Sequence, residues 1–184
     1  MAKVSNNIFV RGLSGSLGDQ FIVRKGRGGS TVITNKPSFA SDRTFNEAQL
    51  AHQDAFRMAI AYAKSAKAQP VYIAKAEGTA QTAFNAAVAD YFGQPEVLEI
   101  DVQDWDGNAG RVLRVKAQDD TQVTGVHIAI TNGNGTTFEQ GQAVQADGLW
   151  WEYTTTSHVV SDPVMVIATA KDLPGNNGQL SWQN

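Results

Sequence analysis

The sequence contains no cysteine among its 184 residues. Disulfide bonds, thiolate nucleophiles and cysteine-ligated zinc or iron–sulfur sites are therefore excluded. Long apolar runs are absent as well. The longest, residues 58–63, ends at Lys64, whereas a membrane-spanning helix needs roughly 20 apolar residues. The stability of the folded chain must therefore come from packing, strand pairing or assembly.

A secretory signal peptide is also not visible. The N-terminus has Lys3 but no apolar segment of about 7 to 15 residues before Arg11. We expect a soluble chain without a membrane span. If it forms a cell-surface or extracellular fibre, it needs another export route, and the alternatives are a cytoplasmic assembly or a phage-like particle.

Charge is distributed unevenly along the chain. Residues 1–43 contain 7 Lys+Arg and 2 Asp+Glu, whereas residues 44–184 contain 8 and 16. A basic arm on an acidic body favours head-to-tail encounter between copies, although charge alone gives little net affinity. The acidic body repels polyanions, so we expect no nucleic-acid partner.

The basic arm reads as short β segments separated by glycine. Gly12, Gly15 and Gly18 recur at every third residue, a spacing that suits turns and bulges. Residues 21–23 and 31–33, joined by a glycine-rich loop, predict a hairpin. Because so few large apolar residues cannot close a core and an isolated hairpin is marginal in water, the arm must dock on its own body or on a neighbour.

This reasoning predicts the residues of an assembly interface. Apolar side chains of the arm would fill pockets on a neighbouring subunit, while basic side chains would face its acidic patches. The predicted interface residues are Ile8, Phe9, Arg11, Phe21, Ile22, Val23, Arg24, Lys25, Arg27, Val32 and Ile33.

Residues 44–94 read as a helical hairpin. Thr44 and Glu47 fit a capping box, and apolar residues then recur at helical spacing to Ala66. Residues 70–73 predict a short extended link, and a second helix is expected from about Thr79 to a stop at Gly93. The aromatic residues expected in the core of this antiparallel pair are Phe45, Phe56, Tyr62, Phe84, Tyr91 and Phe92.

Residues 95–184 are β-rich. Alternation of apolar and polar residues is clear over 97–102, 111–117, 123–130, 150–155 and 164–170. Asn-Gly, Asp-Gly and Pro-Gly turn signals separate these segments. About six or seven short strands at these intervals describe an antiparallel sandwich.

Three stretches of this region resemble bacterial immunoglobulin-like domains. They are the alternating run 114–130, the Gly-Leu-Trp-Trp-Glu-Tyr strand at 148–153, and the closing segment 164–176 with its Ala-Lys-Asp-Leu-Pro-Gly-Asn sequence. The resemblance covers about residues 95–177. It implies a sandwich used as a spacer, adhesive or assembly module, with no catalytic residues to transfer.

Acidic residues give weak candidates for a calcium site. Asp101, Asp104 and Asp106 crowd one turn, where oxygen ligands at alternate positions can coordinate calcium. The spacing fails the EF-hand template, and solvated turn residues are the simpler reading. Asp119, Asp120 and Asp172 could meet at one end of the sandwich as a second oxygen-rich group. We otherwise expect no cofactor.

Tryptophans give candidates for ligand binding. Trp105, Trp150 and Trp151 could form a platform for a glycan or for a subunit interface. Trp150 and Trp151 are adjacent in a predicted strand, so they point to opposite faces, and the inward one belongs to the core.

Together these patterns predict an α+β protein with three regions. They are the glycine-rich β arm at 1–43, an antiparallel helix pair at 44–94 and an immunoglobulin-like β-sandwich at 95–184. The expected function is a bacterial structural subunit that self-assembles into a filament or tube by donating its arm to neighbouring copies. The alternative is a surface or phage-tail-like module that recognises a glycan or protein. No catalytic motif is visible, so we do not expect an enzyme.

Overall fold

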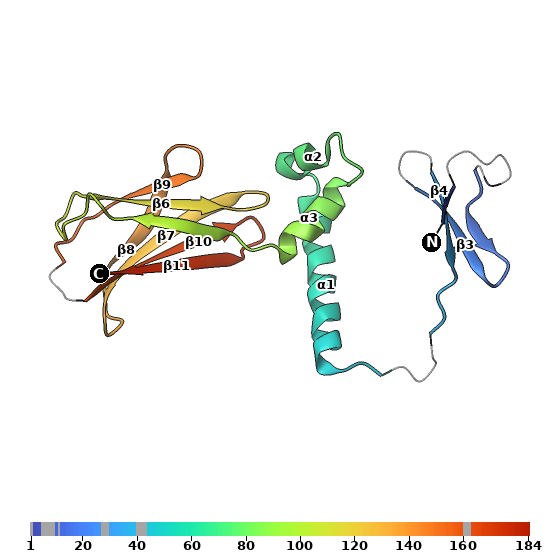
Figure 1. Ribbon diagram of the computed structural model, residues 1–184, viewed down its shortest axis with the longest axis horizontal. Coiled ribbons are helices and arrows are strands. Elements are labelled where there is room, and N and C mark those ends of the chain that lie inside the picture. Colours follow the sequence, from blue (N-terminus) through green and yellow to red (C-terminus); the bar gives the residue numbers. More distant parts are fainter. Residues whose placement is uncertain (1, 5–9, 11, 27–29, 40–43, 160–162) are drawn as a thin grey trace. The chain divides into compact units, whose positions relative to one another are not determined.

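The structure is a computed structural model that describes the chain except for residues 1, 5–9, 11, 27–29, 40–43 and 160–162. In the described residues, four strands are followed by three helices and then by seven strands (Figure 1). The chain therefore mixes helix and antiparallel sheet, as the α+β prediction requires. It divides into two compact units, Met1–Ala55 with Gly78–Ala80 and Phe56–Glu77 with Gln81–Asn184.

The N-terminal strands form one small antiparallel sheet. They are β1 (Ala2–Val4), β2 (Gly15–Leu17), β3 (Phe21–Lys25) and β4 (Thr31–Asn35), in the order β1-β4-β3-β2. The predicted hairpin is confirmed, because Val23 of β3 lies opposite Ile33 of β4. Gly26 closes its turn by donating its N–H to the carbonyl oxygen of Ser30 at 2.6 Å.

Helix α1 (Glu47–Ala66) begins with a capping box. The side chain of Asn46 accepts the backbone N–H of Gln49 at 2.8 Å, and the side chain of Gln49 accepts that of Asn46 at 3.1 Å. The box predicted at Thr44 and Glu47 is wrong by two residues. Asn is as good an N-cap residue as Thr, and Gln49 takes the position that the prediction gave to Glu47.

The extended link predicted for residues 70–73 is wrong, because these residues begin helix α2 (Pro70–Ala76). Pro70 stands in the first turn, where its missing N–H costs nothing. Helix α3 (Ala83–Phe92) follows. The Thr82 side chain caps it by accepting the Asn85 N–H at 3.1 Å, and the helix ends before Gly93, as predicted.

Small residues and one tyrosine form the core of the helical region. Tyr72 is fully buried and packs in a cluster with alanines of α1 and α3, namely Ala63, Ala66, Ala86 and Ala87. Of the aromatic residues predicted for this core, Tyr62 and Phe84 pack against it, but Phe45, Phe56 and Phe92 are exposed. Because alanine side chains are small, the helices approach one another closely, and the single buried ring of Tyr72 fills the space between them.

The C-terminal strands form a seven-stranded antiparallel sheet in the order β11-β10-β7-β8-β9-β6-β5. Strand β8 pairs with β7 over most of its length, but Val144 and Gln145 pair with β9, so β8 carries the sheet around a bend. The last strand lies beside β5, which makes the sheet a nearly closed barrel. The strands are β5 (Glu96–Asp101), β6 (Val112–Gln118), β7 (Val123–Asn132), β8 (Thr137–Gln145), β9 (Trp150–Thr154), β10 (Val164–Asp172) and β11 (Asn177–Gln183).

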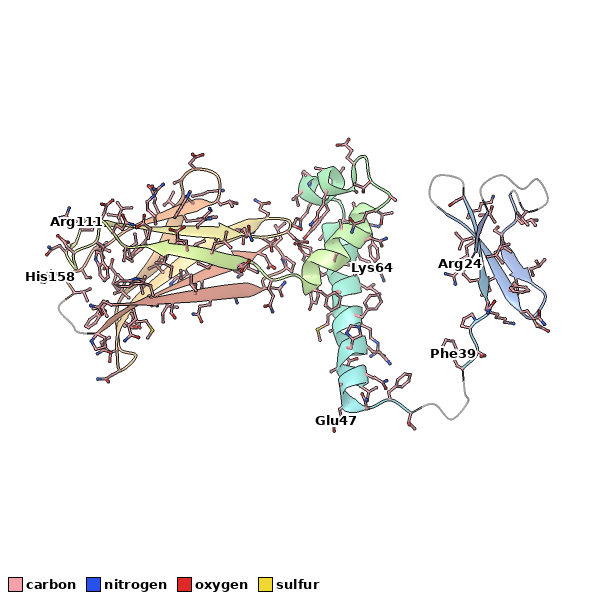
Figure 2. The ribbon with its side chains drawn as sticks, in the orientation of Figure 1. Arg24, Phe39, Glu47, Lys64, Arg111 and His158 are labelled. Carbon is pink, nitrogen blue, oxygen red and sulfur yellow. The ribbon has the colours of Figure 1, made fainter. Side chains whose placement is uncertain are left out.

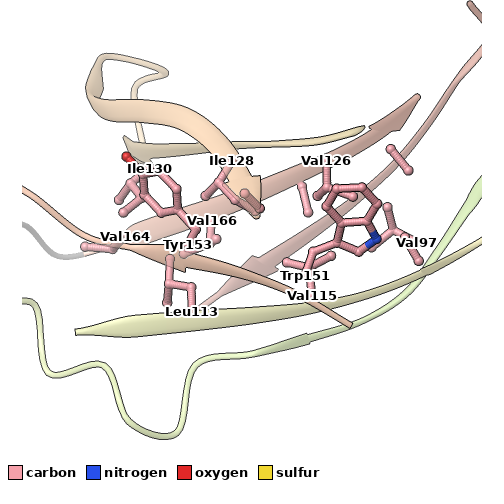
Figure 3. Packing of buried hydrophobic residues seen from close by; sticks show 14 of the residues in the cluster. Val97, Leu113, Val115, Val126, Ile128, Ile130, Trp151, Tyr153, Val164 and Val166 are labelled. Carbon is pink, nitrogen blue, oxygen red and sulfur yellow. The ribbon is translucent and has the colours of Figure 1, made fainter. Parts of the chain in front are cut away.

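Alternate residues of these strands fill the interior of the barrel. Figure 3 shows Trp151 and Tyr153 of β9 packed among aliphatic side chains such as Leu113, Ile128 and Val166. The five segments predicted from alternation all coincide with strands of the barrel. This single core accounts for most of the large buried side chains in the described chain.

Candidate functional site

The predicted assembly residues that can be described lie on the central strands of the N-terminal sheet. Its register places Leu17, Phe21, Val23 and Ile33 on one face, and Ile22, Arg24 and Val32 on the other. Ile8, Phe9, Arg11 and Arg27 lie outside the described residues.

This sheet buries little apolar surface. Among the arm residues whose side chains are described, Val23 is the one buried hydrophobic residue, at 3% exposed, whereas Leu17 is 53% and Phe21 39% exposed. Ile22, Val32 and Ile33 are half-buried, and Arg24 and Lys25 are exposed. Figure 2 shows where Arg24 lies on the sheet. A sheet of this size needs a covered apolar face for stability, so the arm has the composition of an incomplete core.

The edges of the same sheet are unpaired among the described residues. Strands β1 and β2 are the outermost strands, each three residues long, and each has one strand neighbour among the described residues. Unpaired edges present backbone N–H and C=O groups that can add a further strand. The arm therefore offers two exposed apolar side chains, Leu17 and Phe21, and, among its described residues, two edge strands that can pair.

A chain of buried hydroxyl and carboxyl groups lies in the helical region. The Tyr72 hydroxyl donates to Asp90, which is 1% exposed, and lies 2.6 Å from the Tyr62 hydroxyl. Burial raises the pKa of Asp90, and the charges of Asp119 and Asp120 raise it further, although the hydrogen bond from Tyr72 acts in the opposite direction.

The set of acidic residues that meets at this place differs from the set suggested by the sequence, which was Asp119, Asp120 and Asp172. Asp119 and Asp120 gather with Asp90, each offering a carboxylate oxygen within 4.8 Å of the others. Asp172 instead accepts the backbone N–H groups of Gly175 and Asn176 at 2.7 and 2.6 Å.

Lys75 provides the counter-charge for one of these carboxylates, that of Asp120. Its ammonium group donates to the carbonyl oxygen and a carboxylate oxygen of Asp120 at 2.7 and 3.0 Å, and to the Thr121 hydroxyl at 2.7 Å. These contacts tie α2 to the loop before β7, beside the group of carboxylates.

The other calcium candidates are engaged in local contacts. Asp106 forms an ion pair with Arg111 at 2.8 Å, and Asp101 accepts the backbone N–H of Gln103 at 3.0 Å. Asp104 is exposed in the same loop. In the described chain these three residues are not among the groups of carboxylates placed closely enough to share one ion.

The three candidate tryptophans have different environments. Trp151 is buried in the barrel core, and Trp150 lies on the outer surface, with the Arg114 guanidinium 4.9 Å and the Lys116 ammonium 5.8 Å from its ring centroid. Trp105 is half-buried and packs against the core together with Trp182. The sequence pattern missed Trp182, because the strand that carries it has little apolar alternation.

One buried carboxylate was also missed. Glu139 of β8 accepts the Tyr153 hydroxyl at 2.8 Å, both the N–H and the hydroxyl of Thr156, and the N–H of Ser157. Burial alone would raise the pKa of Glu139, but these hydrogen bonds outweigh it and lower that pKa. Burial and Glu139 together raise the pKa of Tyr153 to about 12. All these contacts stabilise the barrel.

No protein-family model matches the sequence, and no curated protein gives a significant match. Among solved structures, a tetra-tandem repeat from the extending region of a large adhesion protein is 20% identical, with 50% of this chain and 24% of that chain covered and a TM-score of 0.38. An engineered protein is 25% identical over 55% and 26% of the two chains, with a TM-score of 0.34.

A conjugative transposon lipoprotein from Bacteroides eggerthii DSM 20697 is 15% identical, with 50% of this chain and 94% of that chain covered and a TM-score of 0.26. The chain spans about a quarter of the length of the first two structures. With TM-scores this low, none of these likenesses decides the fold or the function. Among the described residues, no helix has the length and apolarity needed to cross a membrane.

Proposed function

We propose that this chain is a structural subunit that self-assembles into a filament or tube by donating its N-terminal β arm to neighbouring copies. The observation that carries the proposal is the state of the arm: among the residues whose side chains are described, its sheet buries one hydrophobic residue and exposes Leu17 and Phe21, and each of its two edge strands has one described strand neighbour. A second copy supplies what such a sheet lacks, an apolar surface and a strand partner.

Helix α1 supports the same proposal, because it offers an apolar surface on which the arm of a neighbouring copy can dock. Its buried residues are all alanines in its C-terminal half, Ala59, Ala63 and Ala66. Towards its N-terminus it exposes large apolar side chains, with Phe56 at 47%. An exposed helical segment of this length is marginal in water, so a covering partner would stabilise it.

Charge complements this apolar contact. The arm carries 7 Lys+Arg against 2 Asp+Glu, and the rest of the chain carries 8 against 16. Opposite charges steer encounter and fix register, but exposed ion pairs contribute about 0 to 1 kcal/mol each. At about 25 cal/mol per Å² of apolar surface, burial of a few hundred Å² is the larger contribution. Hydrophobic docking therefore holds the assembly together.

The body of the subunit is proposed to be an immunoglobulin-like domain over about residues 95–177, serving as a spacer. Its antiparallel strands and the inward-facing Trp151 support this proposal. The contacts of Glu139 and Asp172 are structural, and we propose that the protein is not an enzyme. We propose a cell-surface or extracellular fibre as the location of the assembly.

Deletion of residues 1–36 tests the proposal. We expect a folded, soluble subunit without filaments in negative-stain electron microscopy at high protein concentration, whereas the full chain forms them. Raising the salt concentration should slow assembly of the full chain without dissolving finished filaments. Filaments formed by the deletion variant, or a full chain that stays monomeric at high concentration, would refute the proposal.

A matched pair of substitutions tests whether assembly depends on the apolar face of the arm in particular. Phe21→Ser removes an exposed ring from β3, and Gln20→Ser changes the exposed neighbouring residue. We expect Phe21→Ser to abolish or strongly weaken assembly and Gln20→Ser to leave it unchanged. Equal effects of the two substitutions would argue against docking through this face.

A further inference from the structure

The two end strands of the barrel differ in how well they are protected from pairing with another chain. Strand β5 follows Pro95, carries the carboxylates of Glu96, Glu99 and Asp101, and shifts its register with β6 between Val97 and Glu99. Proline, charge and irregular register are the means by which edge strands avoid further pairing. Strand β11 has no charged residue and no proline, and it pairs with β10 over its whole length without a shift. Of the two end strands, β11 is therefore the one suited to receive another strand.

The ladder with β10 leaves the backbone groups on one side of β11 available. The Asn184 N–H donates to the carbonyl oxygen of Val164 at 3.3 Å. In an antiparallel ladder, residues that bond to the partner strand alternate with residues that do not. Gln179, Ser181 and Gln183 therefore turn their N–H and C=O groups away from β10. Among the described residues, the strand order places no strand on that side of β11 (Figure 1).

Part of the barrel core is uncovered along β11. Trp182 packs against the core, and Leu180, two residues before it, lies on the same side of the strand. Leu180 is nevertheless 37% exposed. At Gly178 the strand touches Pro95 so closely that an added Cβ atom would overlap the proline carbonyl group. The seam between β11 and β5 is thus closed at Gly178 and leaves apolar surface exposed at Leu180.

The charge at this seam selects the strand that can be added. Strand β5 lies beside β11, and together they carry three carboxylates and no basic residue. Among the described residues, none of these carboxylates forms an ion pair. Pairing of β11 with β11 of a second copy would bring two acidic sets together, which is unfavourable. The arm, with 7 Lys+Arg against 2 Asp+Glu, brings the opposite charge.

Strand β2 is the part of the arm that fits this position. It is an edge strand of three residues, Gly15–Leu17, and its Leu17 side chain is 53% exposed. The neighbouring strand β3 carries Arg24 and Lys25, both exposed. Apolar side chains that meet across two paired strands stabilise the pair. Leu17 can therefore cover Leu180 while the basic residues of the arm are attracted by the carboxylates of β5.

We propose that β2 in the arm of one copy pairs with β11 in the barrel of another copy, with Leu17 covering Leu180. This inference rests on the proposed function and deepens it, because it names the strand that receives the arm. The sheet of the arm then continues the sheet of the neighbouring barrel. Since each copy has one arm and one β11, the contact is heterologous and repeats from copy to copy.

Cross-linking between copies tests the pairing. The chain contains no cysteine, so an introduced cysteine marks a single site. One preparation carries Ser16→Cys in β2, the other carries Ser181→Cys in β11, and the two are mixed, assembled and treated with a short bismaleimide. Because each copy has one cysteine, a link between residues 16 and 181 must join two copies. We expect mass spectrometry of the digested assemblies to show this link.

Val144→Cys takes the place of Ser181→Cys in the matched control. Val144 is 73% exposed and lies on β8, three strands from β11 in the sheet order. The link between residues 16 and 144 should be much rarer than the link between residues 16 and 181.

A second measurement compares the protein concentrations needed for assembly. Ser181→Lys places a positive charge where the basic arm would pair, and it should raise this concentration about tenfold. Val144→Lys should leave the concentration unchanged. Both positions are exposed, so the urea-unfolding midpoints of the two variants should match that of the wild type.

The outcomes separate this inference from the proposed function. Suppose that the full chain assembles and the deletion of residues 1–36 prevents assembly. Links to residue 181 no more abundant than links to residue 144, or equal effects of the two lysine substitutions, would then overturn pairing with β11 and leave the proposed function standing. Links between two Ser181→Cys copies would assign β11 to a second β11 and overturn the inference as well. A full chain that never assembles would overturn both.

Discussion

The side-chain amide of Asn176 donates a 2.8 Å hydrogen bond to the carbonyl oxygen of Gly93. The same amide reaches the carbonyl oxygen of Tyr91 at 3.3 Å. One side chain from the turn between β10 and β11 therefore satisfies two carbonyl groups at the C-terminal end of α3. These bonds, together with those of Lys75, fix the helices to the barrel.

We expect Asn176→Ala to lower the free energy of unfolding by about 1 to 3 kcal/mol, because it leaves partly buried carbonyl groups without donors. Asn177→Ala is the control, since Asn177 is exposed at the start of β11. Urea denaturation measures both. A loss no larger for Asn176→Ala than for Asn177→Ala would show that the amide does not hold the junction.

Glu139→Gln should destabilise the barrel by about 2 to 3 kcal/mol at neutral pH, because a buried carboxylate with several donors is replaced by an amide. The folded-state pKa of Glu139 is lowered. Its stabilisation is therefore fully present above the unfolded pKa of about 4.3 and is lost as the pH falls through the folded value.

The difference between wild type and Glu139→Gln should accordingly be largest near neutral pH and shrink in acid. Thermal unfolding at a series of pH values measures this difference. Glu152→Gln is the control, because Glu152 forms a partly exposed ion pair with Arg114 and should cost less than about 1 kcal/mol. A difference independent of pH would contradict the assignment.

Asp90→Asn should have the opposite dependence on pH. Because the folded-state pKa of Asp90 is raised, ionisation of this buried group destabilises the fold as the pH rises above the unfolded value of about 3.9. Asparagine can accept the Tyr72 hydrogen bond without charge, and its NH₂ group finds acceptors in Asp119 and Asp120. We expect the variant to match or exceed wild-type stability at neutral pH.

The wild type should regain stability relative to Asp90→Asn as the pH is lowered towards 4. Guanidinium denaturation at each pH provides the measurement, and exposed Asp104→Asn provides the control. A variant that is less stable than wild type by the same amount at every pH would mean that Asp90 is ionised without penalty in the fold.

Alternation in the sequence predicts five barrel strands but not β8 or β11. In β8, Glu139 points inwards and is buried, so a charged residue stands where the pattern expects an apolar one. In β11, Leu180 is exposed, and most of the neighbouring residues are exposed or polar. The sequence of this strand therefore shows no apolar face. Both strands are specified by partners distant in the sequence, which local periodicity does not contain.

In the helical region, too, local sequence patterns do not contain the distant partners that decide the structure. Residues 70–73 have the composition of a strand, and a short apolar run of this kind fits a buried helix equally well. Tyr72 is helical because its ring fills the space between alanines and its hydroxyl reaches Asp90, 18 residues away. The charge split and the hairpin of the arm, by contrast, are local and could be predicted from the sequence.

Gly178→Ala tests how tightly the barrel closes. A Cβ atom added to Gly178 of β11 would overlap the backbone carbonyl group of Pro95, just before β5. Since backbone cannot swing aside like a flexible side chain, we expect a loss of about 1 to 3 kcal/mol or more in the free energy of unfolding. Gly125→Ala is the matched control, because Gly125 also lies in a strand and its Cβ would meet only the side-chain oxygen of Gln142 at 3.7 Å. Urea unfolding followed by tryptophan fluorescence compares the two variants, and equal midpoints would show that β11 and β5 are not in close contact at this seam.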